Sequence, residues 1–386
     1  MNIYLDYNGT TPVDPAVRDE MLPFLGDLYG NPSSTHWAGQ AAREAIDSGR
    51  EQLASLIGGD SQEIIFTGCG SESDNLAIKG TLWSCFQQDL TKAHVITSAV
   101  EHPAILNCCA FLEKLGVDFT YLDVDRDGMI SADQVEAAIT ERTVLVSLML
   151  ANNETGVIFP IEEISRVTRS HGIRLHTDAV QAVGKIPVDV NTLGVDLFSL
   201  SGHKFYAPKG VGALWVRSGV NLEPLIHGGG QEQGRRSGTE AVANIVAVGK
   251  AASLLEPGSL DKERKRLAEL RGNLETELVE KLQRVVFHGS RVERLPNTTN
   301  FSLPGIDGES LRMHLDLQGI AVSTSSACAS RDGKGSLVLR AMGVSEAEAQ
   351  SAIRVSLGRW TTDAEIRQFI DVLVEAAESL WRISPL

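Results

Sequence analysis

A lysine stands at the end of a short apolar run, in a stretch that also holds a serine and a histidine. The run covers residues 195–200 and leads into Ser201, Gly202, His203 and Lys204. An apolar run of this length that ends in serine and glycine is typical of a buried strand entering a loop. Because lysine is usually exposed, a solvated surface loop is the first interpretation. The second is an amine partly removed from water, which titrates low enough to act as a nucleophile.

An aspartate upstream favours the second interpretation. Asp178 ends another apolar run, about one strand-helix-strand step before Lys204. Taken alone, an aspartate at this place is most often a helix N-cap. Paired with Lys204 it suggests pyridoxal phosphate, a cofactor that needs a lysine for its Schiff base and an acid to keep its pyridine nitrogen protonated.

A glycine-rich turn offers a place for the phosphate of such a cofactor. Residues 66–73 read as a strand that runs through Gly68 and Gly70 into a helix that holds Ser71. The free N–H groups and the positive dipole end of a helix suit a phosphate. A plain strand-to-helix turn explains the same residues equally well.

Composition excludes several classes of partner. The chain has 386 residues and a formal net charge of −15, which argues against a nucleic-acid surface and a polybasic membrane patch. No apolar run approaches the length of a membrane span, and the first residues hold no signal core, so we expect a cytoplasmic protein. The five cysteines are few and odd in number, as in a reducing compartment, and none has metal-ligand spacing, so we expect no metal.

The elements that must position these residues form a regular series. Seven apolar runs are predicted as strands, at residues 63–67, 94–98, 119–122, 144–150, 173–177, 195–200 and 211–216. Amphipathic stretches between them, at residues 73–86, 103–115 and 161–171, are predicted as helices. The alternation predicts an α/β fold with a mostly parallel seven-stranded sheet between helices. Ligands of such sheets bind beyond the carboxyl ends of the strands, where Asp178 and Lys204 would meet.

The pattern breaks at residues 256–259. A long helix with a stripe of leucines follows, and the chain closes on a helix over residues 362–381. We therefore predict a large domain at residues 16–257 and a smaller α/β domain made of residues 1–15 and 258–386.

Motifs along nearly the whole chain resemble those of one family. They are residues 4–12, 30–34 with His36, 71–75, 101–102, 152–154, 178–181, 201–204, 228–239, 326–328 and 354–359. Each is weak alone, but together and in this order they resemble the cysteine desulfurases, in the class V aminotransferase branch of the fold-type I pyridoxal phosphate enzymes. Ser71, where threonine is commoner in the family, keeps the hydroxyl. The resemblance implies a homodimer that converts L-cysteine to L-alanine.

The resemblance also implies a role for each residue of the site. Lys204 would bind the cofactor covalently and move the α-proton of the substrate, while Asp178 would pair with the pyridine nitrogen. Asn153 and Arg354 would place the substrate, with Arg354 holding its carboxylate. The other implied cofactor contacts are Gln181 to the phenolic oxygen, the catalytic His102 on the ring face, Gly70, Ser71, Ser201 and His203 to the phosphate, and Thr239 to the phosphate of the neighbouring subunit. Taken alone, His102 is more often a capping loop residue and Arg354 a surface ion-pair partner.

Cys328 separates a desulfurase from a generic aminotransferase. It lies in a run of small and polar residues, 323–336, near Arg331 and Lys334. Segments of this kind are usually exposed, and the two cations would keep its thiol partly as the reactive thiolate. In the family this residue takes the sulfur as a persulfide and passes it to an acceptor such as an iron–sulfur scaffold protein. The remaining cysteines are predicted to be packing residues: Cys69, Cys85, Cys108 and Cys109.

Two alternatives remain open from the sequence. One is a selenocysteine lyase or another class V enzyme that acts on small amino acids. The other is a scaffold that keeps the fold without the activity. The presence of Lys204, Asp178, Cys328 and Arg354 argues against the scaffold.

Overall fold

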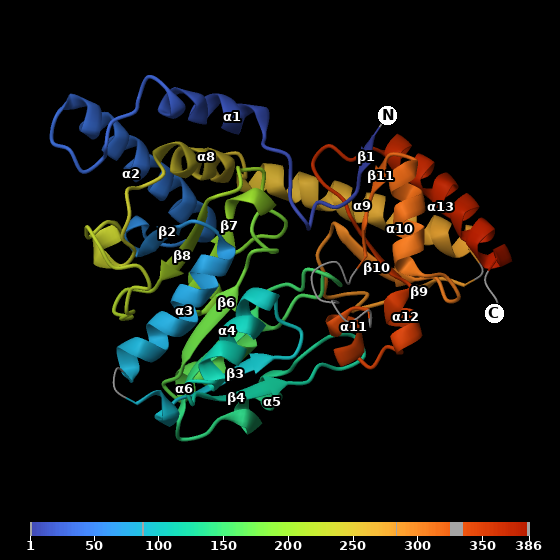
Figure 1. Cartoon of the computed structure of the whole chain (residues 1–386), viewed down its shortest axis with the longest axis horizontal. Helices are drawn as coiled ribbons and strands as arrows, with labels where there is room; N and C mark the ends of the chain where they lie inside the picture. The colour runs from blue at the N-terminus through green and yellow to red at the C-terminus, as the bar shows by residue number, and fades with distance from the viewer. Residues whose placement is uncertain (1, 87–88, 283, 325–334, 384–386) are drawn as a thin grey trace.

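A seven-stranded sheet forms the centre of the larger part of the molecule (Figure 1). The structure is a computed structural model that describes residues 2–86, 89–282, 284–324 and 335–383. In spatial order the strands are β2 (Ile64–Thr67), β8 (Gly212–Val216), β7 (Leu197–Ser201), β6 (Arg174–Asp178), β5 (Thr143–Met149), β3 (His94–Ser98) and β4 (Asp118–Leu122). β8 runs opposite to the other six strands of this sheet, which all point in the same direction. The predicted α/β fold with a mostly parallel sheet is confirmed.

Helices cover both faces of this sheet, which explains why its strands are apolar along their whole length. On one face α3 (Gly70–Cys85) and α4 (Pro103–Glu113) pack on side chains such as Ile65, Val95 and Leu197. On the other face α5 (Ala132–Ala138), α6 (Ile161–Ser170), α7 (Val190–Leu193) and α8 (Val242–Ser253) bury the alternate strand residues. The buried sheet therefore holds the loops that follow its strands in defined positions.

Two helices that the sequence pattern did not predict precede the sheet. They are α1 (Pro15–Met21) and α2 (Trp37–Ile57), with the short turn η1 (Leu22–Leu25) between them. Where α2 crosses α8, a Cβ atom on Gly249 would stand 2.5 Å from the Cα of Gly49. The two glycines thus allow a backbone approach that no larger residue permits.

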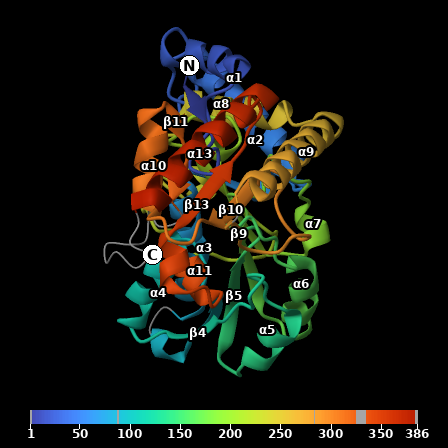
Figure 2. The ribbon, with the colours of Figure 1, turned by 90° about the vertical axis from the view of Figure 1, so that its right-hand side faces the viewer.

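The smaller part of the chain has its own sheet and core. The sheet has the order β12 (Ser323–Thr324), β13 (Ala352–Ser356), β10 (Thr298–Ser302) and β9 (Val286–Phe287). The predicted leucine stripe lies on α9 (Pro257–Lys281), which packs beside α13 (Asp363–Ile383), and α13 packs in turn beside α10 (Gly308–Leu317) (Figure 2). Two short helices, α11 (Leu337–Ala341) and α12 (Glu346–Gln350), complete this part.

The start of the chain joins this smaller part. Strand β1 (Ile3–Tyr4) pairs in parallel with β11 (Ile320–Ala321), and Asp6 forms a bridge with Ser356. The division of the chain into domains at residues 15 and 257 stays a prediction. None of the described helices combines the length and the apolar composition that crossing a bilayer requires.

Candidate active site

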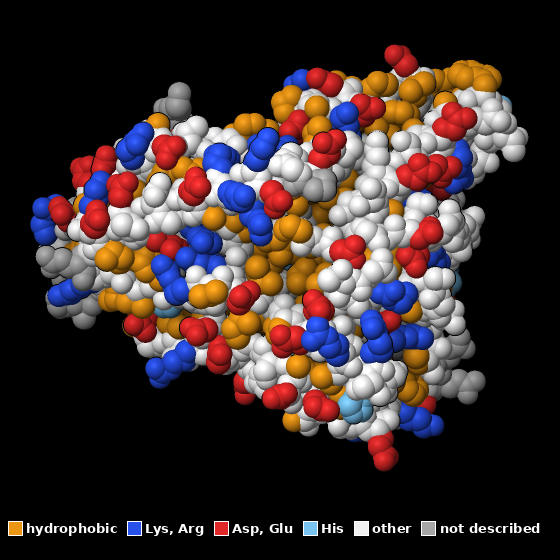
Figure 3. Space-filling view, turned by 180° about the vertical axis from the view of Figure 1, so that it is seen from behind, with side chains coloured by type: hydrophobic (Ala, Val, Ile, Leu, Met, Phe, Trp, Pro, Cys, Tyr) orange, Lys and Arg blue, Asp and Glu red, His pale blue; other side chains and the backbone are white. Residues whose placement is uncertain are grey.

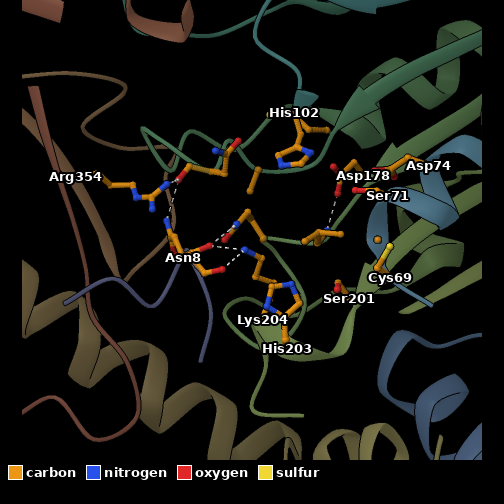
Figure 4. A pocket seen from close by; sticks show the side chains of 17 residues that line it. Asn8, Cys69, Ser71, Asp74, His102, Asp178, Ser201, His203, Lys204 and Arg354 are labelled. Atoms are coloured by element: carbon orange, nitrogen blue, oxygen red, sulfur yellow. Dashed lines mark hydrogen bonds between the residues drawn. The ribbon is translucent and has the colours of Figure 1, made fainter. Parts of the chain in front are cut away.

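One cavity of about 260 Å³ gathers most of the predicted site residues (Figure 4). It opens beyond the carboxyl ends of β5, β6 and β7, as the topology of parallel sheets leads one to expect. Arg354 lies at one end of it, Ser71 and Cys69 lie at the other, and Lys204 and His102 lie between them. The predicted residues that line it are Gly70, Ser71, His102, Asn153, Asp178, Gln181, Ser201, His203, Lys204 and Arg354.

The amine of Lys204 turns back into the protein. The residue ends the one-turn helix η4 (Gly202–Lys204) that follows β7. Its Nζ donates hydrogen bonds to the backbone oxygens of Asn8 at 2.6 Å and of Gly9 at 2.7 Å. The interpretation of Lys204 as a solvated loop residue is therefore wrong. Its amine is held at the wall of the cavity.

Asp178 places a buried carboxylate at the floor of the cavity. The residue ends β6 and is 7% exposed, and its Oδ1 accepts a hydrogen bond from the backbone N–H of Val180 at 2.9 Å. Burial raises the pKa of Asp178, against the opposing effect of His102 and Lys204. A buried carboxylate is stabilised by a nearby cation or hydrogen-bond donor, and the protonated pyridine nitrogen of the expected cofactor would be such a group.

His102 both caps a helix and faces the cavity. Its Nδ1 accepts a hydrogen bond from the backbone N–H of Ala104 at 3.1 Å, so the capping role expected of a lone histidine is present. Burial lowers the pKa of His102, which favours the neutral ring. Because Nδ1 is an acceptor, the neutral ring carries its proton on Nε2.

The end of the cavity beside α3 can hold an anion. A Cβ atom on Gly70 would stand 2.8 Å from a methyl group of Val180, so only glycine fits there. The hydroxyl oxygen of Ser201 is buried and makes no hydrogen bond within the described residues. The N-cap residue of α3, Cys69, caps no N–H group with its side chain. A phosphate group would satisfy both the helix N–H groups and the serine.

His203 closes the same end of the cavity. Its Nδ1 lies 3.1 Å from the hydroxyl oxygen of Thr10. Burial, followed by the charge of Lys204, lowers the pKa of His203 to about 4. The ring is therefore neutral at physiological pH and can donate or accept a hydrogen bond without adding charge.

Arg354 projects from β13 into the opposite end of the cavity. Its side chain is 9% exposed and pairs with Asp6 over 2.6 Å, and its Nη1 donates to the backbone oxygen of Asn153 at 3.0 Å. Its Nε is buried without a hydrogen-bond partner among the described residues. The alternative of a surface ion pair is therefore wrong, because the pair with Asp6 is largely buried and its guanidinium lines the cavity.

Among the residues of the cavity wall that sequence reasoning missed, three bring an amide, a carboxyl group or a thiol. Asn8 is 1% exposed and supplies one of the carbonyl groups that hold Lys204. Asp74 is buried on α3, and its pKa is raised well above the ordinary value by burial and then by Asp178. The third is Cys69. All three lie in or beside the motifs quoted from the sequence, which was the only available signal.

The prediction that four cysteines are packing residues is confirmed for two of them and wrong for the other two. Cys108 and Cys109 are buried packing residues, and burial raises the pKa of Cys108 to about 11. Cys69 and Cys85 are exposed, so the packing prediction is wrong for both. Cys69 is the N-cap residue of α3 and lines the cavity, so its side chain is not part of the apolar core.

One predicted site residue that the structure describes, Thr239, is not in this cavity. Thr239 is exposed and lines a separate hollow with η1 and residues 28–32. The nearby Arg236 pairs with Glu72 over 2.8 Å within the same chain, so its charge is already matched there. Cys328 lies outside the described residues.

Comparison with known proteins identifies the family. The aminotransferase class-V model matches residues 3–369. The chain belongs to the aminotransferase class-V family. Among its relatives, "Cysteine desulfurase IscS" of Dictyoglomus turgidum is 49% identical over 99% of this chain and 96% of its own. "Cysteine desulfurase" of Nostoc sp. is 47% identical over 99% of this chain and 94% of its own.

Two solved structures that are similar to this chain show the same fold. A "NifS-like protein" matches with a TM-score of 0.91 at 38% identity, over 97% of this chain and 99% of its own. "SspA in complex with cysteine" matches with a TM-score of 0.82 at 38% identity, over 93% of this chain and 100% of its own.

Class V enzymes depend on pyridoxal phosphate, and the residues of the cavity fit it. The orphaned hydroxyl of Ser201 and the cradle at Gly70 suit its phosphate. The buried carboxylate of Asp178 suits its ring nitrogen, and the amine of Lys204 faces the same space. The protein is thus a pyridoxal phosphate enzyme of the fold-type I class.

Proposed function

We propose that the protein converts L-cysteine to L-alanine and passes the sulfur, as a persulfide on Cys328, to an acceptor protein. The observation that carries this proposal is the single cavity that holds the Lys204 amine, the Asp178 carboxylate and the Arg354 guanidinium. The names of the full-length relatives, and the cysteine present in the SspA structure, support the choice of substrate.

The charges of the cavity orient an amino acid in one direction. Arg354 would hold the substrate carboxylate, because its guanidinium still has a buried N–H group to donate. The α-carbon would then lie toward Lys204, whose amine takes the α-proton. Asn153, whose backbone oxygen already fixes Arg354, lines the same wall. Bound pyridoxal phosphate supplies the electron sink that makes the loss of this proton feasible.

Asp178 and Cys328 complete the reaction. Asp178 would keep the ring nitrogen protonated, which maintains the sink. The thiolate of Cys328 would attack the substrate sulfur, so that a sulfur–sulfur bond forms while the carbon–sulfur bond breaks. The electrons of the broken bond stay with carbon, which takes up a proton to give alanine. Cysteine and one enzyme thiol thus become alanine and one persulfide, with no external oxidant.

We also propose that two chains build each site. Thr239 lies on the surface beside the end of the molecule formed by α1 and η1, where Figure 3 shows hydrophobic side chains gathered at the upper right. The exposed apolar side chains of this region include Leu22, Leu25, Tyr29 and Trp37, with exposed fractions of 52%, 66%, 76% and 75%. Apolar exposure of this extent favours a subunit contact there. A second copy would be placed so that Thr239 reaches the phosphate of its neighbour.

The shared site can be tested by mixing inactive chains. Lys204→Ala and Thr239→Ala homodimers should each be impaired, whereas heterodimers formed after subunit exchange should recover part of the activity. Alanine production after mixing is the measurement. No recovery in spite of proven exchange contradicts the shared site but not the desulfurase reaction.

As the sulfur acceptor we propose an iron–sulfur scaffold protein, and as the location the cytoplasm. The cysteines of the described residues are all unpaired, which is in keeping with a reducing compartment.

The reaction itself is tested with purified protein. The protein should be yellow, and addition of L-cysteine should yield alanine and, with a thiol reductant, sulfide in equal amounts. Selenocysteine, tested in parallel, should not be preferred over cysteine. A colourless protein that cannot be loaded with pyridoxal phosphate, or one that acts on selenocysteine alone, contradicts the proposal.

A further inference from the structure

A second buried lysine lies beside the cavity and has no part in the roles above. Lys185 is 7% exposed and follows β6 after a turn in which Gly184 has a φ of 77°. Its Nζ donates hydrogen bonds to Oε1 of Gln181 at 2.5 Å and to Oδ1 of Asn8 at 2.9 Å. Both acceptor residues line the cavity, so Lys185 contacts the site through them.

The surroundings of Lys185 do not favour a purely stabilising role. The charged groups that face it are Lys204 and Arg354, which repel its charge, and Asp6, which attracts it. Asp6 is already paired with Arg354. Burial and the two cations lower the pKa of Lys185 well below its ordinary value. A buried amine in this position adds little to the stability of the fold, which favours a role in directing its neighbours.

Lys185 determines which way the amide of Gln181 points. The Lys185 amine donates one hydrogen bond to each of the two amide side chains, so the atom that it meets on Gln181 is the carbonyl oxygen. The NH₂ group of Gln181 is thereby turned away from Lys185, and its Nε2 donates to the backbone oxygen of Asn8 at 3.1 Å. The reversed amide would set N–H groups against the lysine and its oxygen against the backbone oxygen of Asn8, so both of these hydrogen bonds of Gln181 would be lost.

The same lysine directs the side chain of Asn8. Oδ1 of Asn8 accepts from Lys185, and its Nδ2 donates to the backbone oxygen of Asn153 at 3.2 Å and to Thr298 at 2.9 Å. The backbone oxygen of Asn8 then accepts from both Gln181 and Lys204. Nδ2 of Asn297 donates to the same Oδ1 at 3.1 Å. Lys185 and Asn297 therefore fix the direction of the Asn8 amide together, and Lys185 connects it to Gln181.

We propose that Lys185 is a positioning residue that holds the NH₂ group of Gln181 on the cavity side, ready to donate to the phenolic oxygen of pyridoxal phosphate. The proposal rests on the cofactor role expected of Gln181 and deepens the proposed function. A phenolic oxygen that carries negative charge requires a donor, which the other face of the amide cannot supply.

The contact itself can be tested in the protein freed of cofactor. With ¹⁵N-labelled glutamine side chains, the signals of Gln181 are recognised by their absence from Gln181→Leu. Lys185→Met should shift these signals and speed the solvent exchange of their protons, while Lys209→Met, which removes an exposed lysine, should leave them in place. Unchanged Gln181 signals in Lys185→Met would overturn the proposal.

The consequence for the cofactor can be tested in the loaded protein by its visible absorbance as a function of pH. A donor to the phenolic oxygen stabilises the negative charge on that oxygen. Loss of the donor should therefore raise the pH midpoint of the absorbance change. The rise should be about one unit if the free energy lost is that of one charge-assisted hydrogen bond. Lys185→Met and Gln181→Leu should both show this rise, and the double variant should rise no further than Gln181→Leu. Additive shifts would mean that Lys185 acts through its charge alone and would also overturn the proposal.

Two further arms separate the possible causes of failure. Lys185→Gln keeps an N–H donor of similar length, so its midpoint should stay closer to that of the wild type than the midpoint of Lys185→Met; an equal rise contradicts positioning. If Lys185→Met does not fold, this comparison of Lys185→Gln with Gln181→Leu decides alone. A wild-type protein without cofactor absorbance contradicts the proposed function, whereas the signals of Gln181 in the cofactor-free protein still decide the role of Lys185.

Discussion

Replacement of Arg354 by lysine tests whether the guanidinium binds the substrate. Lysine keeps the positive charge but has one nitrogen in place of a planar fork. In the structure Nη1 and Nη2 are already used by Asn153 and Asp6, and Nε remains without a partner. A single ammonium group cannot hold Asp6 at 2.6 Å and a substrate carboxylate in the same geometry, so at least one charge-assisted hydrogen bond to the substrate is lost.

The expected loss follows from the strength of such a bond. A hydrogen bond to a charged group contributes about 1.5–3 kcal/mol, and each 1.36 kcal/mol corresponds to a tenfold change. Arg354→Lys should therefore lower kcat/KM for cysteine by about 10- to 100-fold, mainly through a higher KM. Steady-state alanine production measures both constants. The visible absorbance of the bound cofactor should stay the same, because Arg354 lies at the end of the cavity away from Ser71 and Ser201.

Arg359 provides a matched control in the same segment. It is also partly buried and pairs with Asp14 over 2.7 Å and with Glu263 over 3.1 Å, but it does not line the cavity. Arg359→Lys should lower the melting temperature, because its ion pairs are weakened. It should change KM by less than about twofold, because Arg359 makes no contact with the substrate. If Arg354→Lys has an unchanged KM, or if Arg359→Lys raises KM equally, Arg354 is not the carboxylate-binding residue.

Three other outcomes are expected. Lys204→Ala should abolish the visible absorbance and alanine formation while retaining some bound cofactor, and alanine formation at the wild-type rate would remove Lys204 from the mechanism. Cys328→Ala should keep the cofactor absorbance and the spectral response to cysteine but lose alanine and sulfide together, chiefly in kcat. In the wild type the extra sulfur should map to the Cys328 peptide, and mass spectrometry that finds it on Cys69 contradicts this. Burial raises the pKa of Glu154 to about 7, so the stability linked to its protonated form is present below its unfolded pKa of about 4.3 and is lost as pH rises through about 7. Glu154→Gln should therefore gain in melting temperature relative to the wild type between pH 5 and pH 8, and a constant difference would refute this.

Local patterns were enough to place the strands of the large sheet and the edge where the chemistry lies. All seven predicted strands are present, because strands buried on both faces read as apolar runs. Asp178 and Lys204 meet because parallel neighbouring strands, β6 and β7, end at the same edge. That inference needs only the order of elements and the known geometry of such sheets.

Contacts between distant segments could not be predicted in the same way. The close approach of α2 to α8 depends on contact between Gly49 and Gly249, and the sequence around either glycine does not predict that contact. Exposure of Cys69 depends on where α3 begins, because one turn earlier or later would direct the thiol elsewhere. Lys185 looks like any lysine that follows a turn, and only the folded chain shows its amine between two amide oxygens.

The segment before α1 shows why the site needs both ends of the chain. Asp6 holds Arg354 at the substrate end of the cavity, and the carbonyl oxygens of Asn8 and Gly9 hold the amine of Lys204. Pairing of β1 with β11 anchors this segment to the smaller part of the molecule. The spacing of Arg354 and Lys204 is therefore set by the turn at residues 6–9. Because a side-chain carboxylate holds Arg354 and backbone carbonyl groups hold Lys204, Asp6→Asn should disturb the position of Arg354 while Lys204 keeps its contacts.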